Sequence, residues 1–249
     1  MISIVTPMYN AAAYIMDTIR CVQAQTYTDW EWILVDDHST DDTLAVAERE
    51  AAADPQGRIR VLAMDANSGP ARCRCAGVDA SRGEYLAFLD ADDVWLPKKL
   101  EHELAFLQQE GAVFVCHAYE FGDEQARGTG KAVHPPAVLT YEKALTRTVV
   151  FTSTVMLDMK KLSKEQAHMP DCRSEDTALW WRLMRTGYAC HGLDEVLTIY
   201  RRPAQSLSSN KGRQIRNVWQ LYRVQEGLSV PKSVVCLAGW AVRAVLRRI

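Results

Sequence analysis

The sequence predicts an α/β fold in which a mostly parallel β-sheet is flanked by helices and followed by a helical C-terminal extension. Short apolar runs rich in Val, Ile and Leu alternate with helical stretches through the first half of the chain, which is the pattern of a parallel sheet covered on both faces. The 249 residues, 48% of them hydrophobic, can bury a substantial core. This size fits one large domain with an appendage better than two full domains.

The first half is expected to supply four strands joined by crossover helices. The strands are expected at residues 2–5, 32–35, 60–62 and 85–89. The helices are expected at residues 12–24, 42–53 and 70–80. Pro70 suits the first turn of the third helix, where a missing N–H costs nothing.

After Pro97 we expect a helix that ends near residue 110. The stretch 122–131 is polar and rich in glycine, which predicts a mobile loop. The remaining expected elements are a buried run at 112–116, a strand at 153–157, a helix at 176–186 and a strand at 196–200.

We expect one domain over residues 1–211, divided near residue 116, and a basic helical extension over 212–249. From Tyr200 onward the only acid is Glu226, against ten Lys or Arg. The whole chain carries a net charge of −2, which argues against a nucleic-acid partner. Seven cysteines without a C-x-x-C pair, and no export signal, predict a cytoplasmic protein with free thiols.

Polar side chains follow three of the expected strands. They lie in the segments 6–10, 36–40 and 90–93. Open α/β sheets bind ligands beyond the carboxyl ends of their strands, so these three segments should converge in space.

The third segment is the candidate metal site. Residues two apart in an extended segment point the same way, so Asp90 and Asp92 can present carboxylates to one side. Mg²⁺ and Mn²⁺ prefer oxygen ligands and complete their coordination with substrate phosphates and water. The alternative is a strand-to-helix turn in which Asp93 caps a helix that begins near Leu96.

Five sequence blocks together resemble the family 2 glycosyltransferases of GT-A fold. They are T-P-M-Y-N at 6–10, V-D-D-H-S-T-D-D-T at 35–43, G-P-A-R-C-R-C-A-G at 69–77, A-S-R-G-E-Y-L-A-F-L-D-A-D-D at 80–93 and S-E-D-T-A-L-W-W-R-L at 174–183. The resemblance covers roughly residues 1–200. The segment 200–211 is also similar to bacterial members that build cell-envelope polysaccharides.

The resemblance implies an inverting glycosyltransferase that depends on Mn²⁺ or Mg²⁺. The donor would be a nucleoside diphosphate sugar, expected to be a UDP-sugar, and the acceptor a hydroxyl of a glycan or of a lipid-linked sugar. Residues 1–116 would bind the nucleotide sugar and residues 117–211 would form the acceptor side.

The resemblance also implies roles for individual residues on the donor side. Pro7 and Tyr9 would line the uracil and ribose pocket, Asp37 would accept a hydrogen bond from the base, and Arg74 would lie near the nucleotide. Asp92 would bind the metal, Asp90 the ribose or the metal, and Ala91 lies between them in the same nucleotide-binding block. Two alternatives stay open: Asp37 complements the dipole of the helix at 42–53, and Arg74 pairs with Asp90 or Asp92.

On the acceptor side, the family's E-D pair implies that Asp176 takes the proton of the attacking hydroxyl, with Glu175 beside it. A neighbouring carboxylate and partial burial are expected to raise the proton affinity of Asp176. General-base help of this kind is worth roughly 10² to 10⁴ in rate. The alternative is that Ser174 caps the helix and both acids only complement its dipole.

Two further groups are assigned to the acceptor or sugar side. One of Trp180 and Trp181 is expected to stack on a sugar ring, with burial of both in the core as the alternative. Pro203 stands near where many relatives have a His, so no third protein ligand is assigned to the metal. Arg201 or Arg202 is instead expected to approach the diphosphate and stabilise the leaving group.

The end of the chain has an apolar stretch at 234–242 that is far too short to span a bilayer. With Trp240 and three arginines, residues 232–249 suit a helix lying on a membrane surface with anionic lipid. The alternative is packing on the domain or on a second subunit of a homo-oligomer.

Two rival functions remain. One is a nucleotidyltransferase, but such an enzyme would carry a Gly-rich basic loop after the first strand, and residues 8–13 do not have that composition. The other is an inactive nucleotide-binding or membrane-associated assembly factor.

Overall fold

The computed structural model describes residues 1–147, 149–202 and 211–246. These residues form one mixed sheet in the order β3-β2-β1-β4-β9-β6-β10-β5, with β7 paired to β6 and β8 paired to β10. The strands are β1 (Ile2–Met8), β2 (Trp30–Asp36), β3 (Ile59–Ala63), β4 (Tyr85–Phe88), β5 (Val94–Trp95), β6 (Phe114–Gly122), β7 (Gly128–Val133), β8 (Val138–Leu139), β9 (Val155–Asp158) and β10 (Cys190–Arg201).

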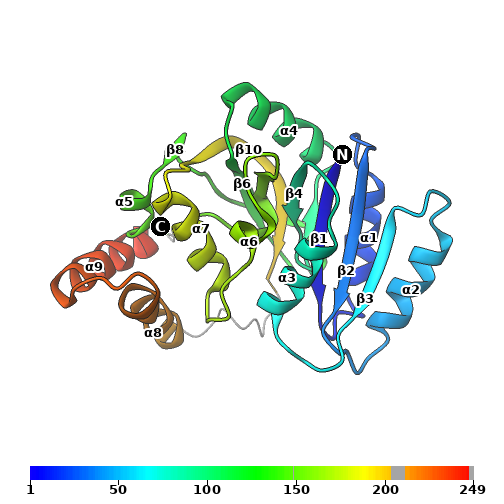
Figure 1. Cartoon of the computed structure of the whole chain (residues 1–249), viewed down its shortest axis with the longest axis horizontal. Helices are drawn as coiled ribbons and strands as arrows, with labels where there is room; N and C mark the ends of the chain where they lie inside the picture. Colours follow the sequence, from blue (N-terminus) through cyan, green and yellow to red (C-terminus); the bar gives the residue numbers. More distant parts are fainter. Residues whose placement is uncertain (148, 203–210, 247–249) are drawn as a thin grey trace.

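The first four strands are parallel, as the sequence predicts. β1 lies between β2 and β4, and β3 forms the outer edge (Figure 1). Met8 stands opposite Asp36, so β1 and β2 end at the same level. Beyond β4 the sheet becomes mixed, because β9 is antiparallel to both β4 and β6, whereas β10 is parallel to β6.

Helices cover both faces of the sheet, and each face has its own hydrophobic core. α1 (Ile15–Gln23), α2 (Thr43–Ala53) and α4 (Lys99–Glu110) pack on one face, and α3 (Pro70–Ala80) and α7 (Glu175–Arg185) pack on the other (Figure 1). Side chains of β1 point alternately to the two faces of the sheet and contribute to both cores. Ile2 and Ile4 join the core under α1, α2 and α4, and Val5 joins the core under α3 and α7. The minor helices are α5 (Tyr141–Ala144), the 3₁₀ turn η1 (Thr152–Thr154) and α6 (Lys164–Ala167).

The expectation of a mobile loop over residues 122–131 is wrong. β6 extends to Gly122 and β7 starts at Gly128, so the two strands form an antiparallel hairpin. Its turn is closed by Arg127, whose backbone N–H and side chain both donate to Asp123 at 2.9 Å. Gly128 suits this position because a Cβ there would lie 2.5 Å from a carboxylate oxygen of Glu120. The glycines at 122, 128 and 130 give this paired segment the composition of a loop.

The sheet is continuous across the expected division near residue 116, because β6 runs over it. That division and the boundary near residue 211 stay predictions. The last described residues form α8 (Lys211–Gln220), the π-turn η3 (Leu221–Gln225) and α9 (Val230–Leu246). These helices lie at the end of the molecule opposite to β3 and α2 (Figure 1).

The C-terminal helices are anchored on α7. The ring of Tyr222 stacks on Trp181 with centroids 5.3 Å apart, and Glu226 forms an ion pair with Arg185 at 3.0 Å. α9 buries Cys236 and leaves Val234 and Val235 more than half exposed. In the parts of the chain that the structure describes, no helix has the length and apolar character to cross a membrane.

Candidate active site

The three strand-end segments converge at one edge of the sheet. The backbone N–H of Asp37 donates to the carbonyl oxygen of Met8 at 2.8 Å, which joins the ends of β2 and β1. Asn10 accepts a bond from the backbone N–H of Thr40 at 2.9 Å, so the two loops remain together beyond the strands. β4 ends beside β1 in parallel register, and its acids follow directly.

The first two segments contain the residues assigned to the nucleotide. Tyr9 is 52% exposed at the end of β1, where a flat ring is free to stack, whereas Pro7 is half-buried opposite Val35. The Asp37 carboxylate is buried and accepts the backbone N–H groups of Ser68 at 2.6 Å and Gly69 at 2.8 Å. It therefore fixes the segment that leads into α3. A carboxylate can accept about four hydrogen bonds, so Asp37 keeps acceptor capacity for the predicted contact with the base.

The alternative role of Asp37, at the start of the helix near residue 42, is wrong. α2 begins at Thr43, and its backbone N–H and hydroxyl both donate to Asp41, at 3.0 and 2.5 Å. Partial desolvation opposes the charged form of this exposed carboxylate, but these bonds, with one from the Ala12 N–H, outweigh it and lower the pKa of Asp41. Asp41 is therefore the acid that serves this helix.

Arg74 joins the strand-end acids to the acids of α7. Its buried guanidinium donates to Asp90 at 2.6 Å and to Glu175 at 2.8 Å. Burial works against the positive charge, but the two carboxylates outweigh it and raise the Arg74 pKa. The predicted pairing with Asp90 is thus one half of a buried bridge that connects residues 101 positions apart.

Asp92 is the least satisfied acid of the cluster. Burial and the neighbouring Asp90 charge raise its pKa to about 6. Across residues 1–147, 149–202 and 211–246, no group donates a hydrogen bond to its carboxylate from another residue. The same described residues contain no group of three His, Cys, Asp or Glu arranged to hold a metal ion. Two carboxylates facing one edge, one of them without a donor, nonetheless fit an oxygen-preferring divalent cation that shares its coordination with phosphates.

Asp93 is not a helix cap. Its side chain is fully buried, accepts the Ser153 hydroxyl at 2.6 Å and the Arg201 backbone N–H at 3.2 Å, and α4 begins only at Lys99. Burial raises its pKa well above the usual value, and the charges of Asp92 and Asp90 add to this effect. Asp93 therefore ties the acidic segment to η1 and β10.

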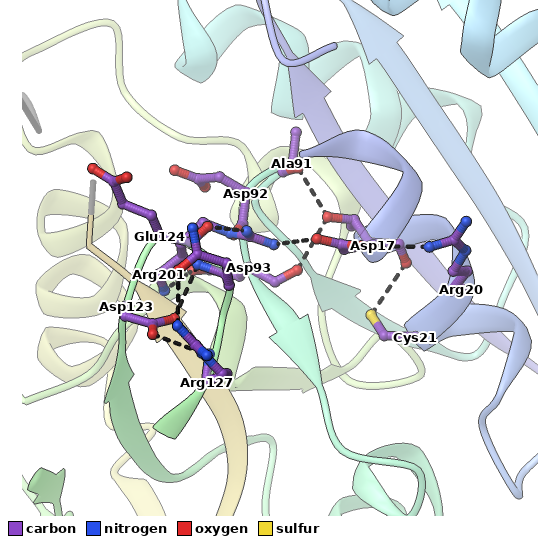
Figure 2. Close-up of polar contacts among 12 residues, drawn as sticks. Asp17, Arg20, Cys21, Ala91, Asp92, Asp93, Asp123, Glu124, Arg127 and Arg201 are labelled. Atoms are coloured by element: carbon purple, nitrogen blue, oxygen red, sulfur yellow. Dashed lines mark hydrogen bonds and ion pairs between the residues drawn. The ribbon is translucent and has the colours of Figure 1, made fainter. Parts of the chain in front are cut away.

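Arg201 supports this segment and is not free to reach a diphosphate (Figure 2). It is the last residue of β10 and 2% exposed. Its guanidinium donates to the carbonyl oxygen of Asp92 at 2.7 Å, to the carboxylate of Asp17 at 2.9 Å and to the carbonyl oxygen of Glu124. The predicted contact of Arg201 with the leaving group is therefore corrected to a positioning role. The same expectation for Arg202, whose guanidinium lies 4.0 Å from the ring centroid of Phe121, stays a prediction.

Asp176 lies in the first turn of α7, on the far side of the Arg74 bridge. Its carboxylate accepts the Thr152 hydroxyl at 3.2 Å and the Thr177 backbone N–H at 2.6 Å. Burial raises the pKa of the adjacent Glu175, Arg74 opposes the increase and the Asp176 charge adds to it. The alternative in which Ser174 caps the helix is wrong, because its side chain makes no capping bond and its backbone is left-handed at φ 60°.

The turn η1 is a part of the site that the sequence did not reveal. Thr152 donates to Asp176, while Ser153 donates to Asp93 and accepts the Asp90 backbone N–H at 3.0 Å. Two successive hydroxyl residues thus connect the strand-end acids to α7. Serine and threonine are too common for this role to be recognisable without the fold.

Trp180 and Trp181 are both in the core, the alternative that the sequence left open. Each is 2% exposed. Trp180 packs against Phe114, with centroids 5.1 Å apart, and Trp181 stacks on Tyr222. Neither ring is presented to a sugar in this structure.

The fold and the site define a nucleotide-sugar transferase of GT-A type. Residues 3–162 match the family described as Glycosyl transferase family 2, which is more than half of the chain. The chain therefore belongs to glycosyltransferase family 2 and is a glycosyltransferase, as the sequence blocks predict.

Two relatives resemble the chain over most of its length. The putative teichuronic acid biosynthesis glycosyltransferase TuaG of Bacillus subtilis is 36% identical over 250 residues, covering 100% of this chain and 98% of the relative. The UDP-Glc:alpha-D-GlcNAc-diphosphoundecaprenol beta-1,3-glucosyltransferase WfgD of Escherichia coli is 30% identical over 223 residues, covering 89% of this chain and 85% of the relative.

Solved structures share the fold at low sequence identity. S. aureus TarS 1-349 in complex with UDP-GlcNAc superimposes with a TM-score of 0.72 at 19% identity, over 96% of this chain and 71% of that chain. The mannosyltransferase PcManGT from Pyrobaculum calidifontis, in complex with GDP-Man and Mn²⁺, gives 0.69 at 15% identity, over 98% and 75%. These likenesses confirm the predicted GT-A fold.

Proposed function

We propose that this glycosyltransferase moves one sugar from a UDP-sugar to a hydroxyl of a glycan or lipid-linked acceptor during synthesis of a cell-envelope polysaccharide. The observation that carries the proposal is the Asp90–Arg74–Glu175 bridge, because it holds the acids of α7 next to the acids at the strand ends. A donor diphosphate on one side of this bridge would have a proton acceptor on the other. The choice of UDP follows the donor named for WfgD and the ligand of TarS.

The donor would bind across the ends of β1, β2 and β4. Tyr9 offers an exposed ring for the uracil, Pro7 and Ala91 line the pocket, and Asp37 accepts a hydrogen bond from the base. Asp92 and Asp90 would hold Mn²⁺ or Mg²⁺, and that ion when bound would neutralise part of the diphosphate charge. Arg74 donates to the Asp90 carboxylate at 2.6 Å and holds it in position for this task.

Asp176 would carry out the proton transfer. The acceptor hydroxyl loses its proton to this carboxylate while its oxygen bonds to the anomeric carbon, and the bond from that carbon to the diphosphate oxygen breaks on the opposite face. The configuration at the anomeric carbon is therefore inverted. Thr152 and the Thr177 N–H hold the carboxylate in place during this step.

We also propose that the protein works at the cytoplasmic face of a membrane, where α9 touches the lipid surface. Val234, Val235 and Val242 are exposed on this helix, which also carries Lys232 and Arg243. An acceptor on a lipid carrier would then be delivered close to α7, on which the C-terminal helices are anchored. A second subunit is the alternative occupant of this apolar face.

The donor half of the proposal is tested without knowledge of the acceptor. UDP and GDP are compared by thermal shift with and without Mn²⁺, and UDP-sugars are then scanned for slow hydrolysis that releases UDP. Stabilisation by UDP with Mn²⁺ and metal-dependent hydrolysis of at least one UDP-sugar are expected. Nucleotide binding without any hydrolysis would favour an inactive assembly factor, and no binding of either nucleotide would refute the proposal.

A further inference from the structure

A basic hollow lies where the C-terminal helices meet the loop before α7. It has a volume of about 400 Å³ and is lined by Arg173, Arg216, Asn217 and Gln220. Three of these residues come from α8 and share one side of that helix, because Gln220 lies three residues after Asn217 and four after Arg216. None of the four belongs to the strand ends proposed to bind the donor.

The position of α8 relative to α7 is fixed by packing. Val218 of α8 and Leu221 of η3 are buried. The ring of Tyr222, also in η3, stacks on Trp181 of α7 at an interplanar angle of 4°. Because α7 also carries Asp176, the hollow and the proposed proton acceptor stand on one rigid support. Arg173 precedes Asp176 by three residues, which limits their Cα separation to about 11 Å.

Both arginines of the hollow lack a counter-charge. Within the described ranges, no carboxylate forms an ion pair with Arg173 or Arg216. Asp171 pairs with Arg72, and Glu175 pairs with Arg74. Asp176 also follows Arg173 closely in the chain, but its carboxylate accepts from Thr152 and from the Thr177 N–H. Two unneutralised guanidiniums with two amide side chains form a set of donors suited to an oxyanion and to sugar hydroxyls.

We propose that this hollow binds an acidic group of the acceptor, either a phosphate or a carboxylate next to the sugar that is glycosylated. Arg173 and Arg216 hold the anion, and Asn217 and Gln220 bind neighbouring hydroxyls. The C-terminal extension thereby completes the acceptor site and selects anionic acceptors over neutral ones. This inference rests on the proposed function, because it requires the acceptor hydroxyl to stand at Asp176.

The test is a calorimetric titration of the full chain after saturation with UDP and divalent metal, so that the donor site is occupied. The probes are inorganic phosphate, which represents a phosphate-linked acceptor, and glucuronate, which represents an acidic glycan. Arg173→Ala and Arg216→Ala should each weaken binding of one probe at least about tenfold, the loss expected for one charge-assisted hydrogen bond. Arg49→Ala is the matched control, since Arg49 lies on α2 at the other end of the molecule and pairs with Glu50.

The probe that responds identifies the anion. Equal affinities in all four proteins, or no uptake of either probe at millimolar concentration, would overturn the inference. If UDP does not bind but the anion does, and both arginine substitutions still weaken anion binding, the proposed function is refuted and the inference about the hollow stands. Each result is therefore assigned to one of the two proposals.

Discussion

Replacement of Arg74 by Met should destabilise the protein strongly, because it leaves two carboxylates facing each other without their shared cation. The side chains of Arg74, Asp90 and Glu175 are 6%, 23% and 16% exposed, so neither acid is fully hydrated. Breaking a buried ion pair from one side costs about 3 to 5 kcal/mol, and the partial exposure of Asp90 places the expected loss at about 3 kcal/mol. For a chain of this size that is a decrease in Tm of roughly 6 to 12 °C.

The measurement is urea unfolding followed by tryptophan fluorescence, with Arg72→Ala as the control on the same helix. Arg72 pairs with Asp171 through side chains that are 62% and 70% exposed, so its loss should cost about 0.5 kcal/mol. Glu175→Gln should fall between the two variants, because the amide oxygen still accepts from Arg74. The reasoning is refuted if Arg74→Met loses no more stability than Arg72→Ala.

Three further outcomes are expected. Asp92→Asn should weaken UDP binding about tenfold or more with Mn²⁺ present and change it little without metal, as measured by calorimetry. The same loss of affinity in both conditions would show that Asp92 is not a metal ligand. Burial lowers the pKa of His117 below its ordinary value, so its contribution to stability is complete above about pH 6.5 and is lost as the pH falls below it, by up to about 1.4 kcal/mol per pH unit. Unfolding between pH 7 and 5 should therefore be less dependent on pH in His117→Gln, and an unchanged slope would contradict this assignment. Val234→Glu combined with Val235→Glu should reduce co-sedimentation with vesicles that contain phosphatidylglycerol, whereas equal recovery would favour a second subunit as the occupant of this face.

The parts of the site that come from chain topology were predictable from the sequence. Apolar runs mark the parallel strands, and the rule that ligands bind beyond strand ends predicts that residues 6–10, 36–40 and 90–93 come together. Resemblance then supplies roles that spacing alone leaves open, most clearly for Asp176. These roles stay predictions until substitution and binding measurements test them.

The contacts that hold the site together were not predictable. Arg74 and Glu175 are 101 residues apart, and they come within 2.8 Å only because α3 and α7 contribute to the core on the same face of the sheet. Arg201 falls just beyond the strand expected at 196–200, but β10 includes it, and this position directs its guanidinium inward to Asp17. Trp181 is buried by Tyr222 of the extension, a partner that no local pattern reveals.

The central claim is tested most directly by Asp176→Asn, compared with the native protein for UDP affinity and for sugar transfer or donor hydrolysis. The account predicts UDP affinity within about threefold of the native value and a decrease in turnover of roughly two decades or more. Turnover that stays within about tenfold of native, with UDP binding intact, would show that another group takes the proton.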